Sequence, residues 1–248
     1  NGVRRAEVFF DPQAHTSRGV PLEAVIKGYS RAARDAQADF GVSADLILCF
    51  LRDLSAESAL ETLREALQYR EYFIGVGLDS DERSNPPEKF AEAFTLAKDA
   101  GLHVTMHCDI DQEGSIQNIE TALTALGTER LDHGTNIVEN PALMDIVRER
   151  GIGLTCCPVS NSFVTEDMKA KEIVDLLRDG VKVALNSDDP AYFGAYIGVN
   201  YLSLAHATGL TREEVAQIAR NSFDVAWISD EERAGYLAEI DAYLAEAA

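Results

Sequence analysis

Histidine and aspartate residues lie at the C-terminal ends of several short apolar runs in this 248-residue chain. His107 and His133 lie near the ends of two such runs, and Asp188 and Asp189 follow a third. In a parallel α/β barrel, the residues that follow the strands gather at one rim. Histidine and carboxylate together are the usual ligands of a catalytic divalent metal, most often zinc. The sequence therefore predicts a metal site at that rim.

An ordinary structural role is the alternative for each of these residues. A histidine at a strand end is often only hydrogen-bonded, and the Asp-Asp-Pro of 188–190 is typical of a helix start, since Asp caps well and Pro suits the first turn. The polar segment 79–90 fits a surface loop. We favour the metal site because these groups coincide at one predicted rim. His103 and His206 lie away from it and are expected to be structural, while His15 lies on it and its role stays open.

Seven apolar runs with the character of buried parallel strands alternate with amphipathic stretches. The runs are 6–10, 45–50, 73–78, 103–108, 130–134, 152–158 and 182–188. This alternation predicts a parallel sheet covered by helices. The alternative, an open doubly wound sheet, lacks its Gly-rich phosphate motif after the first run. We therefore predict an α/β fold of the (β/α)8 TIM barrel type, incomplete at the N-terminus because seven of its eight strands are visible.

The rest of the chain gives no sign of a second domain. Helices are expected after the last strand at 194–208, 211–228 and 230–246, and no linker or low-complexity tract interrupts the sequence. The prediction is a single barrel domain over 1–248. Because the chain lacks an initiator Met and starts close to a strand, we expect further sequence before residue 1.

The charge of the chain is strongly acidic. Its 42 acidic and 22 basic residues give a net charge of -20, which disfavours nucleic acid and anionic membranes as partners because both need clusters of Lys and Arg. No apolar run reaches the roughly 18 residues of a membrane helix. The four cysteines show no CxxC spacing, so we expect reduced thiols in a cytoplasmic enzyme. The H-x-E…P-C-x-x-C pattern of cytidine-deaminase-type zinc sites is absent.

Six segments spread through the chain resemble the adenosine deaminase family of the amidohydrolase superfamily. They are FFDPQAHTSRG (9–19), GVGLDSDERSNPPEKF (75–90), TMHCD (105–109), ERLDHG (129–134), TCCPVSN (155–161) and NSDDPAYFGAY (186–196). The second and last segments look closer to the adenine deaminase branch than to the branch that acts on adenosine. The resemblance implies a metal-dependent purine deaminase on a (β/α)8 barrel.

The resemblance also implies roles for single residues. His107 and Asp188 match metal ligands, and His133 matches the histidine that orients and activates the water on the metal. Asp189 matches the aspartate that contacts purine N7. The metal implied is one zinc ion per subunit, with another divalent ion such as Fe2+ as the alternative.

The chain departs from the family pattern at two of the groups that the chemistry needs. The family has a His-x-His pair on its first strand, and no His-x-His occurs anywhere in this chain. The family general acid is a Glu three residues after the metal-ligand His, where this chain has Ile110. The downstream match EGS…TERLDHG instead assigns that role to Glu113, with Asp111 and Asp109 as competitors.

The predicted reaction is hydrolytic deamination of adenine to hypoxanthine and ammonia by a metal-activated water. Asp79 and Ser80 are expected to bind the purine, although many relatives have a Gly at the position of Ser80. The alternative substrates are adenosine and an N6-substituted adenine. An interpretation of another class is a catalytically inactive barrel fragment without the His-x-His ligands. The expected partner is a small-molecule purine, and the sequence makes no prediction of the oligomeric state.

Overall fold

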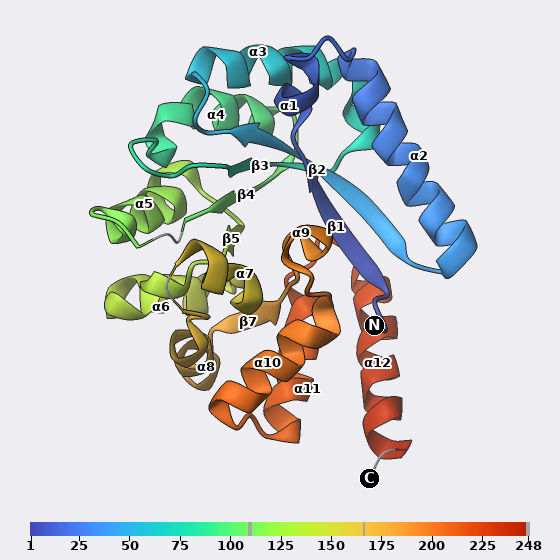
Figure 1. The fold of residues 1–248 in the computed structure, drawn as a ribbon, viewed down its shortest axis with the longest axis vertical. Coiled ribbons are helices and arrows are strands. Elements are labelled where there is room, and N and C mark those ends of the chain that lie inside the picture. Colours follow the sequence, from blue (N-terminus) through green and yellow to red (C-terminus); the bar gives the residue numbers. More distant parts are fainter. Residues whose placement is uncertain (109–110, 166, 247–248) are drawn as a thin grey trace. The chain divides into compact units, whose positions relative to one another are not determined.

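The computed structural model of the chain describes residues 1–108, 111–165 and 167–246 (Figure 1). These residues fall into two compact units, which we describe separately. The β1–β4 unit contains residues 2–108 and 117–129. The β5–β7 unit contains residue 1, the described part of 109–116, and the described part of 130–248.

The β1–β4 unit is built on four parallel strands that lie side by side in chain order. The strands are β1 (Arg5–Phe10), β2 (Ser43–Leu51), β3 (Gly75–Asp79) and β4 (His103–His107). The intervening helices are α1 (Pro12–Thr16), α2 (Leu22–Phe40), α3 (Ala56–Ala66), η1 (Leu67–Tyr72), η2 (Pro87–Phe90) and α4 (Ala91–Asp99). Helices α5 (Ser115–Thr121) and η3 (Ala122–Leu126) follow β4 in the chain.

The β5–β7 unit continues the same alternation with three parallel strands. They are β5 (Arg130–Asp132), β6 (Gly153–Cys156) and β7 (Lys182–Leu185). The helices between them are η4 (Thr135–Glu139), α6 (Pro141–Arg150), α7 (Pro158–Val164) and α8 (Ala170–Arg178). After β7 come α9 (Pro190–Phe193), α10 (Ile197–Thr208), α11 (Arg212–Asp224) and α12 (Asp230–Glu246).

Local sequence explains where these elements form. Strand β2 is nearly all apolar, and Leu46 to Phe50 are at most 3% exposed, as expected of a parallel strand covered on both faces. Helix α3 buries Ala59, Leu60, Leu63 and Ala66 on one face, and Ser55 caps it by accepting a hydrogen bond from the Ser58 amide. Helix α6 ends at Gly151, whose φ of 67° suits the left-handed cap.

All seven predicted strands are present, and each starts within two residues of its predicted start. The first three predicted strands end within one residue of the observed ends, whereas the last four extend one to three residues too far, into the loops that follow the strands. The first C-terminal helix starts at Ile197 rather than 194, since the short helix α9 and its cap Gly194 come first. The prediction of one domain over 1–248 stays a prediction.

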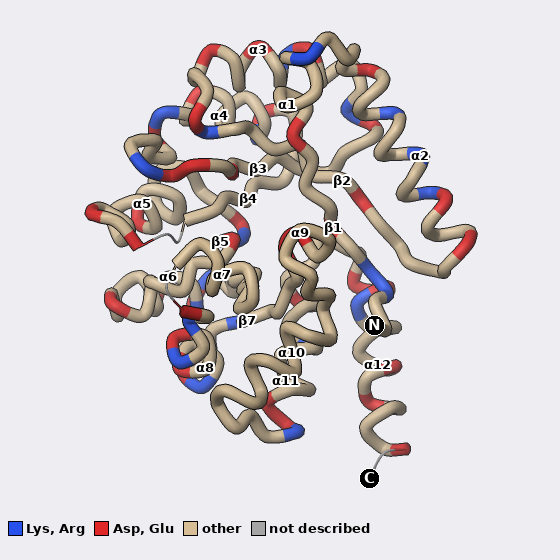
Figure 2. The backbone as a smooth tube through the Cα atoms, in the orientation of Figure 1, with Lys and Arg blue, Asp and Glu red and all other residues tan. Residues whose placement is uncertain are grey.

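Residues of both charge signs are interspersed along α2 and α8 (Figure 2). This spacing forms ion pairs one turn apart, between Lys27 and Glu23 on α2 and between Lys171 and Asp175 on α8. In the part of the chain that the structure describes, no helix has the length and apolar character needed to span a membrane.

Candidate active site

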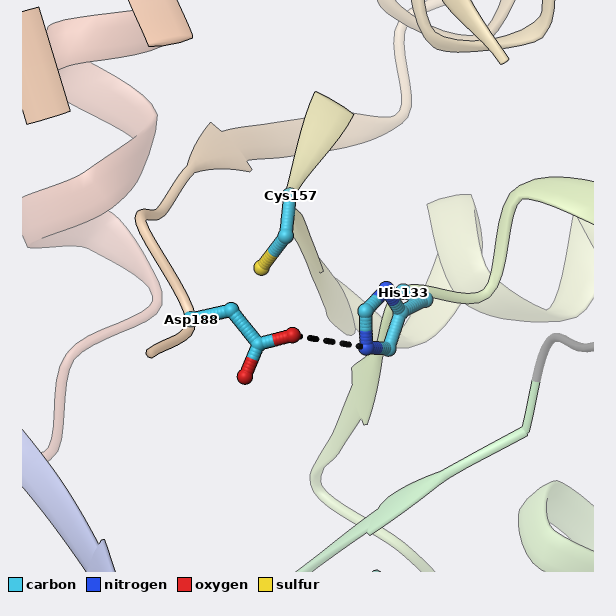
Figure 3. A group of neighbouring side chains, drawn as sticks. All are labelled: His133, Cys157 and Asp188. Carbon is cyan, nitrogen blue, oxygen red and sulfur yellow. Dashed lines mark ion pairs between the residues drawn. The ribbon is translucent and has the colours of Figure 1, made fainter. Parts of the chain in front are cut away.

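Three side chains from successive strand ends meet in the β5–β7 unit. His133 follows β5, Cys157 follows β6, and Asp188 lies beyond β7. Figure 3 shows the three side chains directed toward one another, and their ligand-capable atoms all lie within 4.8 Å of one another. The Nε2 of His133 lies 3.8 Å from Oδ2 of Asp188. The structure therefore brings together two residues that the sequence assigns to the metal site.

Hydrogen bonds from α7 fix both of these side chains. The Nδ1 of His133 lies 2.9 Å from Oδ1 of Asn161, and an amide oxygen only accepts, so Nδ1 carries the proton. Nε2 is then the nitrogen with the lone pair, and it faces Asp188. Ser160 Oγ donates to Asp188 Oδ2 over 2.6 Å. Sequence reasoning matched the segment 155–161 but assigned no role to Ser160 or Asn161.

The backbone is strained at the same two residues. His133 has a φ of 62° and Asp188 a φ of 53°, in the left-handed region that L-residues rarely adopt. Such a conformation costs about 1–3 kcal/mol and occurs mainly where the surrounding structure imposes it, often at functional sites. Strained backbone at both His133 and Asp188 is therefore consistent with a functional site that orients these two side chains toward each other.

Cys157 belongs to the packing around this pair. Burial raises the pKa of its thiol well above the ordinary value, and the nearby Asp188 carboxylate adds to the shift. Zinc binds the thiolate rather than the thiol. We therefore interpret Cys157 as a small core residue, and Cys108 and Cys156 are buried as well.

Asp189 occupies the N-cap position of α9, and its neighbour Pro190 opens the helix. Its side chain makes no capping hydrogen bond, and the residue is exposed. The helix start therefore accounts for Pro190 but not for the carboxylate of Asp189.

The β1–β4 unit places His107 at the last position of β4. The His107 Nδ1 lies 3.1 Å from the carbonyl oxygen of Leu78, and its ring packs edge-on against Phe9 at 5.5 Å between centroids. A carbonyl accepts, so Nδ1 carries the proton and Nε2 the lone pair. Metal-binding histidines usually have this arrangement, with the second nitrogen held by a carbonyl or carboxylate. The side chain therefore fits the metal-ligand role that the sequence predicts.

Asp79 and Ser80 lie at the end of β3 in the same unit. An oxygen of Asp79 lies within 4.8 Å of the Cys49 sulfur and of an oxygen of Asp11, which the sequence analysis did not single out. Two carboxylates, one after β1 and one at the end of β3, can accept hydrogen bonds from the N–H groups of a ligand.

Ser80 has a φ of 73°, which explains why a glycine suits this position. We expect Ser80→Gly to raise the free energy of unfolding by about 1 kcal/mol. Relief of left-handed strain, about 1–3 kcal/mol, should outweigh the added flexibility of the unfolded chain, about 0.4–1 kcal/mol. Denaturant titration measures the change. Ser80→Ala keeps the strain and is the matched control, so a glycine variant no more stable than the alanine variant would contradict the explanation.

The residues proposed as general acid differ in their surroundings. Lys169 Nζ lies 2.7 and 2.8 Å from the two carboxylate oxygens of Asp111, and Asn136 Nδ2 donates to one of them over 3.1 Å. Partial burial acts to raise the pKa of Asp111, but the hydrogen bonds from Lys169 and Asn136 outweigh it and lower that pKa. Glu113 is exposed in the turn before α5. The third competitor, Asp109, lies outside the described residues.

The remaining histidines occupy structural positions. His103 Nδ1 lies 2.7 Å from Glu129 Oε2, at the start of β4. His15 lies on α1, with Nδ1 3.3 Å from Arg18 Nη2 and the ring edge-on to Tyr29 of α2. These contacts account for His15 without a metal.

The model of the family described as "Adenosine deaminase" matches residues 1–243. The chain belongs to the adenosine deaminase family. Members of this family are metal-dependent hydrolytic deaminases. The resemblance that the sequence motifs carried is therefore confirmed.

Similarity to single proteins agrees with this membership. An adenine deaminase from Hahella chejuensis is 47% identical over 98% of this chain and 72% of its own length. The crystal structure of an adenine deaminase from Arthrobacter aurescens superposes with a TM-score of 0.92 at 39% identity, covering 98% of this chain and 74% of that one. An amidohydrolase from Burkholderia ambifaria with bound Zn has a TM-score of 0.86 at 30% identity, covering 99% and 70%.

These similarities also establish the fold class of this family member. It is the (β/α)8 barrel of the amidohydrolase type, and the described residues of this chain contain seven of its parallel strands. The predicted fold class is confirmed.

Proposed function

We propose that this deaminase converts adenine to hypoxanthine and ammonia, with zinc as its metal. The observation that carries the proposal is the pairing of His133 Nε2 with Asp188 Oδ2, which Asn161 and Ser160 hold in place. The choice of adenine is supported by relatives named adenine deaminase at 39–47% identity. The choice of zinc is supported by the zinc-bound relative and by the imidazole and carboxylate donors. Fe2+ is the alternative ion.

His107 and Asp188 are the residues proposed to hold the metal. The Nδ1 of His107 donates to a carbonyl, which leaves Nε2 as the donor atom toward a cation. Asp188 offers a carboxylate whose Oδ2 already accepts a hydrogen bond from Ser160, and this fixes its orientation. A bound zinc ion would lower the pKa of water toward 7 and so make a nucleophile available at neutral pH.

The other residues act on the water and on the purine. His133, with its lone pair on Nε2, orients the water and accepts its proton. As the water oxygen bonds to C6 of adenine, Glu113 protonates a ring nitrogen. The amino group then leaves C6 as ammonia with the proton that His133 took from the water. As the C6 carbonyl forms, the remaining hydroxyl proton restores the protonated form of Glu113. Asp189 accepts or shares a proton at N7, and Asp79 and Ser80 line the purine.

We prefer Glu113 over Asp111 as the general acid because the surroundings of Asp111 favour its ionised form. A general acid must be protonated when it acts. Asp111 is held ionised by Lys169 and Asn136, and its oxygens are occupied. We propose instead that Asp111 fastens the segment that carries Glu113 to the segment that carries Lys169.

Adenine should be a better substrate than adenosine. We expect a higher kcat/KM for adenine in steady-state assays that follow ammonia release from both compounds. An N6-substituted adenine assayed in parallel tests the remaining alternative. A higher kcat/KM for adenosine would refute the assignment of the substrate without affecting the assignment of the metal ligands.

A cytoplasmic location is part of the same proposal. All four cysteines are buried and free of disulfide bonds. Such thiols are typical of a reducing compartment.

A further inference from the structure

Arg52 is a fully buried cation next to the strand end that carries His107. It follows β2 and is 0% exposed. Its Nη1 donates to the carbonyl oxygen of His107 over 2.7 Å, and its Nε donates to the carbonyl oxygen of Asn85 over 3.0 Å. Its backbone amide bonds the carbonyl of Asp79 over 3.0 Å. One residue therefore connects the C-terminal ends of β2, β3 and β4.

A buried carboxylate lies beside the Arg52 guanidinium. Glu82 Oε2 lies 3.8 Å from Arg52 Nη1, and Glu82 is itself 5% exposed. Buried ion pairs contribute little net stability, because desolvation offsets their attraction, and apolar residues of similar volume often replace them without loss. A contribution to fold stability therefore does not explain why position 52 is an arginine. The guanidinium geometry explains the arginine, because its N–H groups donate to the carbonyl oxygens of Asn85 and His107 at the same time.

The β3–β4 register and the Arg52 side chain contact opposite ends of β4. The β3–β4 register pairs Gly75 with His103 and Val76 with Val104, at the beginning of β4. The β2–β3 register, in contrast, continues to the pair Leu51 and Asp79 at the end of β3. At His107 the ring donates a hydrogen bond to the Leu78 carbonyl, and Arg52 donates one to the His107 carbonyl. These two bonds fix the ring and the main chain of the residue.

We infer that Arg52 is a positioning residue that holds His107 in the orientation needed to bind the metal, and so sets metal affinity. The inference rests on the proposed role of His107 as a ligand. Removing a group that orients a metal ligand typically weakens metal binding about 10–100-fold.

The test measures the zinc Kd of purified, metal-stripped protein by competition with a chromophoric chelator. We expect Arg52→Met to weaken zinc binding about 10–100-fold. Arg52→Lys keeps the charge beside Glu82 but cannot reach both carbonyls, so we expect a loss of about tenfold, at the lower end of that range. The lysine variant decides the matter if the methionine variant fails to fold.

Arg5→Met is the matched control. Arg5 is a buried arginine of the same unit, 6% exposed in its side chain and paired with Glu7 and Asp45, but it lies at the opposite end of the sheet. We expect this variant to lose stability and keep its zinc Kd. Arg52 variants that bind zinc as tightly as Arg5→Met would overturn the inference while leaving the proposed function intact. His107→Ala serves as the reference: if it leaves the zinc Kd unchanged, both the inference and the proposed metal site are wrong.

Discussion

Asp188→Ala should purify almost without zinc, whereas Asp189→Ala should retain it. Asp188 is a proposed metal ligand whose carboxylate faces His133 and is oriented by Ser160. Asp189 occupies the N-cap position of a short helix without a capping hydrogen bond, and we assign it to the substrate. Turnover of the Asp188 variant should fall by about 10³-fold or more, because the ion that activates water is lost. The Asp189 variant should lose about 10–100-fold in kcat/KM, the value of one hydrogen bond to a charged group.

The backbone at Asp188 requires a second variant. With a φ of 53° at this residue, alanine adds strain to the loss of a ligand. Asparagine tolerates the left-handed region better and keeps the shape, so Asp188→Asn separates the two effects. We expect Asp188→Asn to lose zinc as well. Elemental analysis of the three purified variants gives the answer, and equal metal loss from the Asp188 and Asp189 variants would mean that the two roles are wrongly assigned.

The fold could be predicted from the sequence because its signals are local. Each strand is a short apolar run buried by the helices around it, and the polar residues that follow mark its end. His133 and Asp188 could be placed together for the same reason, since each follows a parallel strand of one sheet. What the sequence missed are residues that act across elements. No sequence pattern marks Asn161 or Arg52, and their roles become visible only from the atoms that they contact in the structure.

Backbone conformation was also hidden from the sequence. A positive φ is usually signalled by Gly or Asn, yet His133 and Asp188 both adopt it. Asp and His adopt positive φ more often than most other residues, but residue type alone does not show which Asp or His does so. The same limit applies to Asp111, whose ion pair joins it to Lys169, 58 residues further along the chain.

Glu113→Gln should lower kcat by about 10²–10⁴-fold while leaving zinc bound, because glutamine keeps the shape of the side chain but cannot donate a proton. Asp111→Asn should act differently. Asp111 is an ionised partner of Lys169, so its loss should loosen the segment before α5, raise KM and change kcat by less than about tenfold, well short of the loss of a general acid. Because its pKa is lowered in the folded state, the contribution of Asp111 to stability is present at neutral pH. It is lost only as the pH falls through that lowered pKa.

The measurement that separates the two carboxylates is a pair of pH profiles of kcat/KM, each with zinc content determined on the same sample. In Glu113→Gln, loss of the general acid should abolish the limb of the profile over which that acid loses its proton. In Asp111→Asn, loosening of the segment should lower kcat/KM at every pH and leave the shape of the profile unchanged. Lys169→Met is the matched control for Asp111→Asn, since it breaks the same ion pair from the other side and leaves both carboxylates in place. If Asp111→Asn abolishes the limb and Glu113→Gln merely lowers the curve, then Asp111 is the acid, and the lysine that now holds it ionised must move away when the purine binds.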